Sequence, residues 1–212
     1  MARALVTGLG GGARIPPGDT TRRGTLGEMP PSSTRTVPPD LLGLLAGKYV
    51  ASHSLRVARL AFQVALLSGE CPPEDAYLAG LLHDLGKTRL PGEVLGKPGR
   101  LDPQEFALVR THPELGVQLL LEAWPDCPAE IVAGVRDHHE REDGRGYPAG
   151  LDGPLAALTG MVAVADVYDA LTSERGYRPV AFTHGEALAI MQAQGLPERY
   201  VALLDRFRPE GG

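Results

Sequence analysis

Imidazole and carboxylate side chains recur along this chain at positions where they could bind metal ions together. The chain contains six histidines, and His184 lies apart from the segments that hold the others. The five candidate ligands are His53, His83, His112, His138 and His139. Imidazoles combined with carboxylates suit iron, manganese or zinc rather than calcium. These candidates are too many for one tetrahedral site, so we expect two metal ions.

Asp166 lies in the middle of Met161–Leu171, which is apolar on nearly every side. A helix of this kind is expected to be buried. A buried carboxylate without a partner costs several kcal/mol, and no Lys or Arg lies within one helical turn of Asp166. The sequence therefore predicts that Asp166 binds a metal ion.

His83 and Asp84 are adjacent and follow an apolar helical segment. Neighbouring residues on a helix point about 100° apart, so both can reach one site only where the helix ends. We expect Gly86 to end that helix.

Helical periodicity dominates from residue 40 onward, and no segment shows sustained alternation with period two. The sequence therefore predicts an all-α fold. Asp102, Pro103 and Glu105 form a predicted helix start with a capping box. The expected helices cover residues 55–67, 73–86, 102 onward, 112–121, 129–137, 154–172, 185–194 and 197–207, and a loop spans 141–153.

The composition is that of an ordinary globular domain, with 43% hydrophobic and 22% charged residues. No apolar run is long enough to cross a bilayer, so we expect no membrane insertion. Cys71 and Cys127 lack metal-ligand spacing and suggest no disulfide framework, which favours a cytoplasmic protein. The net charge of −5 divides into +3 on residues 1–39 and −8 on the rest, which argues against binding to a nucleic-acid polymer.

Residues 1–39 contain seven Gly, six Pro and six Thr, a composition that predicts a disordered leader before a domain at 40–212. A glycine-rich run at 4–12 superficially resembles a phosphate-binding loop. Pro16 and Pro17 prevent a helix from following it, so we do not assign a nucleotide site there.

Several motifs resemble one known family. His83-Asp84-Leu-Gly-Lys87 resembles the HD motif of the HD superfamily of metal-dependent phosphohydrolases. His138-His-Glu-Arg-Glu-Asp-Gly-Arg-Gly-Tyr-Pro148 matches HHExxDGxGYP, the motif that defines the HD-GYP branch. Segments beginning at His53, Lys97, His112 and Ala165 are similar to the family's other conserved blocks and follow its order. The resemblance covers about residues 47–190.

The resemblance implies an HD-superfamily helical bundle with its metal site in the core. It also implies hydrolysis of cyclic di-GMP to the linear dinucleotide pGpG, to GMP or to both, by a hydroxide that bridges two iron or manganese ions. Tyr49 stands where some members carry a third-metal carboxylate, which favours a dinuclear site. By position, the implied ligands are His53, His83, Asp84, His112, His138, His139 and Asp166.

The resemblance also implies roles in catalysis and substrate binding. Lys87 is assigned to contact with the phosphate or the nucleophile, and Asp84 to catalysis as well as to the metals. Asp169 lies three residues beyond Asp166 on the same helix face, so we expect it to orient a ligand or a base. The implied substrate-binding residues are Gly146, Tyr147, Arg175 and Arg178.

Two alternatives remain open at this point. One is an HD-type phosphohydrolase that acts on another nucleotide, and the other is a non-catalytic receptor for a cyclic dinucleotide. A receptor is expected to lack a ligand, and none of the core ligands is missing. For any of these functions, we expect regulation by signalling partners or by a homodimer, because no receiver or sensor segment is apparent.

Overall fold

The protein is described by a computed structural model. Its described residues are 37–39, 41, 43, 51–174 and 180–207. Several sequence-based expectations fall outside the described residues. These are Tyr49, Arg175, Arg178 and the leader, of which only residues 37–39 are described.

Every regular element in the described part of the chain is a helix, and loops and one isolated β-bridge, between Asp143 and Asp152, connect these helices. The predicted all-α class is therefore confirmed. Within these residues, no helix combines the length and apolarity that crossing a bilayer requires. The elements are α2 (Ala51–Ser68), α3 (Pro73–Leu82), the 3₁₀ helix η1 (Leu85–Arg89), α4 (Gly92–Leu95), α5 (Pro103–Val109), α6 (His112–Ala123), α7 (Ala129–Asp137), α8 (Ala157–Thr172), α9 (His184–Gln192), α10 (Glu198–Leu204) and the 3₁₀ helix η2 (Asp205–Phe207).

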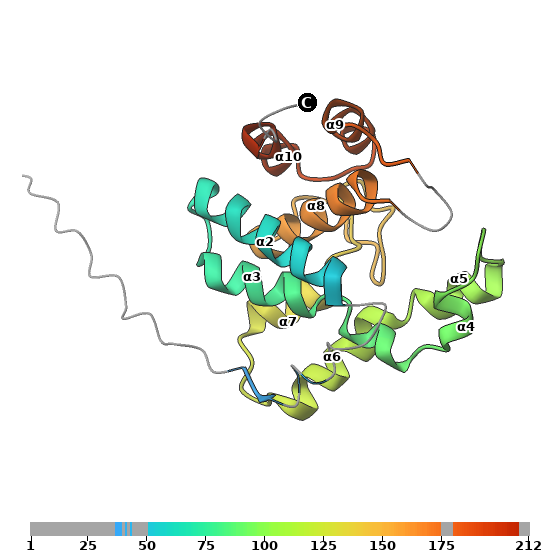
Figure 1. The fold of residues 1–212 in the computed structure, drawn as a ribbon. Coiled ribbons are helices and arrows are strands. Elements are labelled where there is room, and N and C mark those ends of the chain that lie inside the picture. The colour runs from blue at the N-terminus through green and yellow to red at the C-terminus, as the bar shows by residue number, and fades with distance from the viewer. Residues whose placement is uncertain (1–36, 40, 42, 44–50, 175–179, 208–212) are drawn as a thin grey trace, which may run out of the picture. The chain divides into compact units, whose positions relative to one another are not determined.

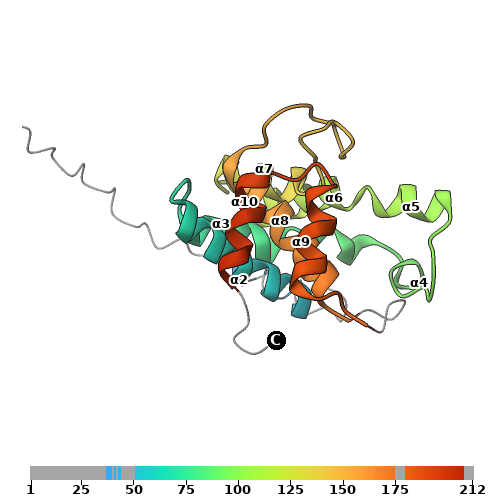
Figure 2. The same ribbon diagram turned by 90° about the horizontal axis from the view of Figure 1, so that it is seen from above.

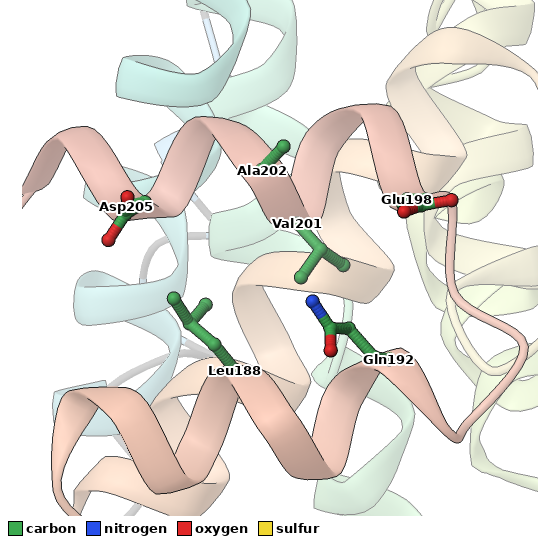
Figure 3. Close-up of a pocket in the computed structure, with 6 residues that line it drawn as sticks. All are labelled: Leu188, Gln192, Glu198, Val201, Ala202 and Asp205. Carbon is green, nitrogen blue, oxygen red and sulfur yellow. The ribbon is translucent and has the colours of Figure 1, made fainter.

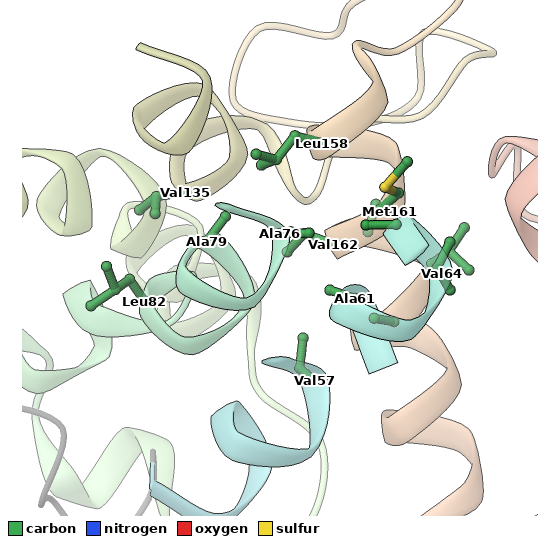
Figure 4. Close-up of a cluster of buried hydrophobic side chains, with 14 of the residues drawn as sticks. Val57, Ala61, Val64, Ala76, Ala79, Leu82, Val135, Leu158, Met161 and Val162 are labelled. Carbon is green, nitrogen blue, oxygen red and sulfur yellow. The ribbon is translucent and has the colours of Figure 1, made fainter. Parts of the chain in front are cut away.

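The hydrophobic core lies between α2, α3, α7 and α8, which all contribute side chains to the cluster in Figure 4. Every residue from Leu158 to Asp166 on α8 is buried. This helix can be apolar on all sides because α2, α3 and α7 pack against it and α9 and α10 cover it further (Figures 1 and 2). The one charged residue in the buried stretch is Asp166, so the core itself presents a carboxylate.

Capping residues set the starts of two helices. Asp102 accepts hydrogen bonds from the backbone N–H groups of Gln104 and Glu105, and the Glu105 side chain accepts from the Asp102 N–H, which confirms the predicted capping box. A second capping box, formed by Thr183 and Glu186, starts α9 at His184. The sequence-based start at Gly185 was one residue late because Thr183 was not identified as the cap.

Gly86 has a different role from the one expected. Helix α3 ends at Leu82, before Gly86, and η1 follows it. A Cβ atom on Gly86 would lie 1.9 Å from the backbone oxygen of His112 and 2.5 Å from the nitrogen of Gly116. Glycine is therefore required because η1 and the first turn of α6 are in backbone contact. This contact holds Asp84 and His112 close together.

The substitution Gly86→Ala tests this close approach. The obstructing atoms are backbone, so they cannot rotate away, and we expect the free energy of unfolding to fall by about 3 kcal/mol. Gly185→Ala is the matched control, because Gly185 lies in α9 with open space around its Cα. That change should leave stability unchanged or raise it by about 0.5–1 kcal/mol. Equal stability of both variants in denaturant titrations would contradict the packing role.

Candidate metal centre

The structure brings all seven predicted ligands into one cluster. Their donor atoms fall into three overlapping groups, each with its atoms within 4.8 Å of one another. These groups are His53, His83 and Asp166; His83, Asp84 and His138; and His112, His138 and His139. We call this set the histidine cluster.

Five segments position the histidine cluster. Helix α2 carries His53, and the first residue of α6 is His112. His83 and Asp84 lie between the end of α3 and the start of η1. His138 and His139 directly follow α7, and Asp166 projects from the middle of α8. Most of these ligands lie at helix ends, where the chain turns and side chains can point inward between helices.

Backbone carbonyls fix the orientation of three imidazoles. The Nδ1 atom of each contacts the carbonyl oxygen of the residue three positions earlier, at 2.7 Å for His83, 2.7 Å for His112 and 2.8 Å for His138. A carbonyl oxygen only accepts, so each Nδ1 carries the hydrogen. In the neutral ring, Nε2 then has a free lone pair, and it points into the cluster.

These lone pairs create contacts that a cation would relieve. The Nε2 atoms of His112 and His138 lie 3.2 Å apart, and both side chains are fully buried. His83 Nε2 and Asp84 Oδ1 are buried without a hydrogen-bond partner. Unsatisfied acceptors in a buried site are costly, and a divalent metal ion satisfies several at once. The donor set therefore fits a metal centre.

We call the two groups that do not contain Asp84 the outer groups: His53, His83 and Asp166, and His112, His138 and His139. Asp84 lies between them. Its Oδ2 atom is 3.4 Å from His83 Nε2, whereas its Oδ1 atom is 3.3 Å from His112 Nε2. Each oxygen thus faces a different set of imidazoles. A carboxylate in this position can contribute one oxygen to each of two metal ions.

Asp169 orients His53 and belongs to none of the three ligand groups. Its Oδ2 atom accepts a hydrogen bond from His53 Nδ1 at 2.6 Å, and Arg56 donates to both of its oxygens. This leaves His53 Nε2 directed toward Asp166 Oδ1, 3.0 Å away. The geometry places Asp169 behind a ligand.

The electrostatics favour the ligand form of most members. Burial and the neighbouring imidazoles hold the pKa of His138 well below its usual range, and burial lowers the pKa of His139 to about 3. Burial raises the pKa values of Asp84 and Asp166, but nearby histidines outweigh it and both pKa values end well below the usual range. Neutral imidazoles and ionised carboxylates are the species that bind metals.

Lys87, in η1, points back to the cluster. Its Nζ atom donates to Asp84 Oδ2 at 2.7 Å. The ammonium is only partly buried, so it lies at the edge of the site beside the carboxylate that separates the two groups.

Sequence analysis missed Glu140. This buried carboxylate accepts hydrogen bonds from the backbone N–H groups of Ala149, Gly150 and Leu151, and so anchors the loop that follows α7. Gly146 contacts the same segment, because a Cβ there would lie 2.4 Å from the Glu140 Cα. The sequence signal was the position of Glu140, directly after two ligand histidines and before a glycine-rich loop.

Tyr147 lies beside the cluster. Its ring stacks on the His139 ring with 4.5 Å between centroids and an interplanar angle of 23°. The guanidinium carbon of Arg110 lies 4.7 Å from the Tyr147 centroid. His139 therefore already occupies one side of the tyrosine ring that was expected to contact substrate.

A pocket of about 330 Å³ lies elsewhere, between α9 and α10 (Figure 3). It is lined by Leu188, Gln192, Glu198, Val201, Ala202 and Asp205. None of these is a predicted site residue, and the chemistry-bearing side chains are concentrated in the histidine cluster.

Comparison with known proteins agrees with this geometry. A family model described as HD domain matches residues 49–200, which is most of the chain. This chain belongs to the HD domain family. The HHExxDGxGYP motif at 138–148 places this HD domain in the HD-GYP branch.

Two curated relatives illustrate the similarity. The HD domain is 40% identical over 167 residues to a protein of Pseudomonas aeruginosa named cyclic di-GMP phosphodiesterase PA4108, covering 76% of this chain and 40% of that one. It is 38% identical over 147 residues to 3'3'-cGAMP-specific phosphodiesterase 3 of Vibrio cholerae, covering 68% of this chain and 31% of the relative. The chain thus spans well under half the length of either relative.

Solved structures share the fold. Bd1817 of Bdellovibrio bacteriovorus, titled a HDG"Y"P protein, matches with a TM-score of 0.60 and 22% identity over 74% of this chain and 52% of that one. The HD domain of PgpH from L. monocytogenes, solved in complex with cyclic-di-AMP, matches with a TM-score of 0.55 and 17% identity over 78% of this chain and 92% of that chain. At these identities the likeness concerns the fold alone.

The substitution Asp166→Asn tests the metal assignment. Losing a hydrogen-bond partner of a ligand typically lowers metal affinity by roughly ten- to a hundredfold. Asp166→Asn removes a charged donor itself, so metal affinity should fall by more than about a hundredfold. Elemental analysis of protein purified without oxygen measures this. Asp126→Asn, at an exposed carboxylate, is the control and should retain the wild-type metal content. Equal metal content in both variants would remove Asp166 from the ligand set.

Proton release should accompany metal binding. Burial lowers the pKa of His53, but hydrogen bonds with Asp166 and Asp169 outweigh it and raise the pKa to about 9. A metal ion binds only the unprotonated Nε2 atom, so near neutral pH about one proton should leave His53. The apparent affinity for Mn²⁺ should therefore increase as the pH rises toward about 9.

Calorimetric titration in buffers with different ionisation enthalpies measures this release. Asp169→Asn is the matched variant, because it removes the negative charge of one of the two carboxylates that raise the pKa of His53, and it should release less proton. Heats that do not depend on the buffer would contradict the protonated His53.

Proposed function

We propose that this HD domain is a metal-dependent phosphodiesterase that hydrolyses cyclic di-GMP to pGpG, to GMP or to both. The observation that carries the proposal is Asp84, whose two oxygens face separate groups of imidazoles. Such an arrangement suits two divalent cations on either side of one carboxylate. Several relatives named for cyclic dinucleotide hydrolysis support the substrate class.

We propose two metal ions per chain, because the donors combine imidazoles with carboxylates. Iron and manganese are the metals that the family resemblance implies. Bound divalent cations supply activation of water and neutralisation of charge on the phosphate. The imidazoles of the two outer groups would hold them, with His53 oriented by Asp169 and with His139 stacked on Tyr147.

Other residues act on the substrate in this proposal. Lys87 is beside Asp84 and can donate to a phosphate oxygen or deliver a proton to the departing ribose oxygen. Tyr147 and Gly146 border the cluster from the loop that Glu140 anchors, and the tyrosine hydroxyl or the free edge of its ring can contact a nucleotide. Arg175 and Arg178 remain proposed contacts from the sequence resemblance.

A second candidate function is hydrolysis of 3'3'-cGAMP, for which several relatives are named. Both substrates contain two phosphodiesters and at least one guanine, so the cluster alone does not separate them. The third candidate is a receptor without catalysis, which we expect to lack a metal ligand. The grouping of all seven predicted ligands in one cluster supports catalysis instead.

Turnover by anaerobically purified protein tests the proposal. Wild-type protein loaded with iron or with manganese is incubated with cyclic di-GMP and, separately, with 3'3'-cGAMP, and products are resolved by chromatography. We expect metal-dependent formation of pGpG or GMP from cyclic di-GMP, faster than hydrolysis of 3'3'-cGAMP.

The control is Asp166→Asn, which should bind little metal and form almost no product. Faster hydrolysis of 3'3'-cGAMP would transfer the assignment to that substrate. Tight binding of cyclic di-GMP without product, in fully metal-loaded protein, would favour the receptor.

A further inference from the structure

Arg110 is a cation at the edge of the histidine cluster that the proposed function does not yet use. It follows α5 directly, and its backbone N–H donates to the carbonyl of Phe106. Its neighbours in the chain are tied to the cluster, because the Val109 carbonyl orients His112. The position of Arg110 is therefore coupled to that of a ligand.

The Arg110 guanidinium completes a stack that begins at the ligands. The ring of His139 lies 5.1 Å from that of His112, and the Tyr147 ring lies 4.5 Å from that of His139. Arg110 then lies over the Tyr147 ring, with its guanidinium carbon 4.7 Å from the centroid. His139, Tyr147 and Arg110 come from different segments, and their stack leads outward from the candidate metal centre.

The cation–π contact leaves the hydrogen-bond donors of Arg110 available. Such a contact uses the face of the guanidinium, whereas its five N–H groups lie in the plane of the group. Arg110 is exposed, and it makes no ion pair or side-chain hydrogen bond within the described part of the chain. A planar group with free donors is suited to a phosphate, which it can bind through two parallel hydrogen bonds.

The charge balance of the site creates a need for this cation. The cluster holds two carboxylates, Asp84 and Asp166, and Asp169 lies behind it. Two cations near these groups already have carboxylate partners: Lys87 pairs with Asp84 and Arg56 with Asp169. A cyclic dinucleotide carries two phosphodiesters on one ring. If one of them lies at the metals, the other remains outside the cluster and requires its own positive partner.

We propose that Arg110 binds the phosphodiester of a cyclic dinucleotide that is remote from the metal centre. The Tyr147 ring holds the guanidinium at the edge of the cluster, and its free donors recognise the second phosphate. This inference rests on the proposed function, and it assigns Arg110 to selection of dinucleotides over substrates that have a single phosphodiester.

Steady-state kinetics of wild-type, Arg110→Gln and Arg110→Lys protein test this role. The substrates are cyclic di-GMP and bis(p-nitrophenyl) phosphate, which has only one phosphodiester. For Arg110→Gln, the ratio of kcat/KM for cyclic di-GMP to that for bis(p-nitrophenyl) phosphate should fall by roughly ten- to a hundredfold, the scale of one charge-assisted hydrogen bond. Most of that change should be in KM for cyclic di-GMP, and Arg110→Lys should be intermediate.

Arg100→Gln is the matched control, because Arg100 is another exposed arginine without an ion pair in the described residues. It should keep the wild-type ratio. Metal content separates substrate contact from structural support, since Arg110→Gln should retain full metal. A parallel loss of metal and of activity on both substrates would make Arg110 a brace for Tyr147 and would overturn the proposal.

Inhibition by GMP distinguishes phosphate from base. GMP has a guanine but only one phosphate, so Arg110→Gln should weaken its inhibition far less than it weakens the use of cyclic di-GMP. Equal weakening would assign Arg110 to the guanine and overturn the phosphate contact.

A binding experiment separates failure of the proposed function from failure of this inference. If the wild-type protein hydrolyses no cyclic dinucleotide, equilibrium binding of cyclic di-GMP to manganese-loaded protein decides the inference. Weaker binding by Arg110→Gln than by Arg100→Gln supports it, whereas equal binding, or no binding even to wild-type protein, refutes it.

Discussion

One buried carboxylate, Asp84, lies between two groups of imidazoles and links the packing of the helices to the site. Its position requires that η1 run in direct backbone contact with the start of α6, which only glycine at position 86 permits. That contact brings His112 within 3.3 Å of one Asp84 oxygen while the other oxygen faces His83. A charge buried in this way is tolerated when several partners satisfy it, and here imidazoles, Lys87 and the proposed cations supply them. Stability of the core and chemistry of the site are therefore linked at the same residue.

Hydrogen bonds behind the histidines orient their Nε2 atoms toward the centre of the cluster. Three backbone carbonyls fix the protons of His83, His112 and His138 on Nδ1, and Asp169 does the same for His53. As a result the Nε2 atoms converge before any metal is present, which reduces the reorganisation that binding requires. On the outer side, Glu140 anchors the loop that carries Tyr147, and the Tyr147 ring connects His139 to Arg110. The site thus extends continuously from buried ligands to an exposed cation that can meet a second phosphate.

Much of this arrangement could be predicted from the sequence. The apolar periodicity of α2 and α8 specified helices, and Asp166 was recognisable because an apolar helix has no solvated face for a carboxylate. The roles of Glu140 and Arg110 could not be predicted, because each depends on a contact made after the chain folds: a loop backbone for Glu140 and the Tyr147 ring for Arg110. The predicted role of Gly86 was wrong. A glycine near a helix end suggests that the helix terminates there, whereas the structure requires glycine because the backbone of α6 approaches closely. Arg175 and Arg178 lie outside the described residues and stay predictions.

Anomalous diffraction from crystals of anaerobically prepared protein tests whether Asp84 separates two metal positions. Data collected on both sides of the iron or manganese absorption edge locate each bound ion and identify its element. We expect two peaks with Asp84 next to both. One peak should lie next to His53, His83 and Asp166, and the other next to His112, His138 and His139. A single peak, a third peak, or two peaks that both lie away from Asp84 would contradict this arrangement.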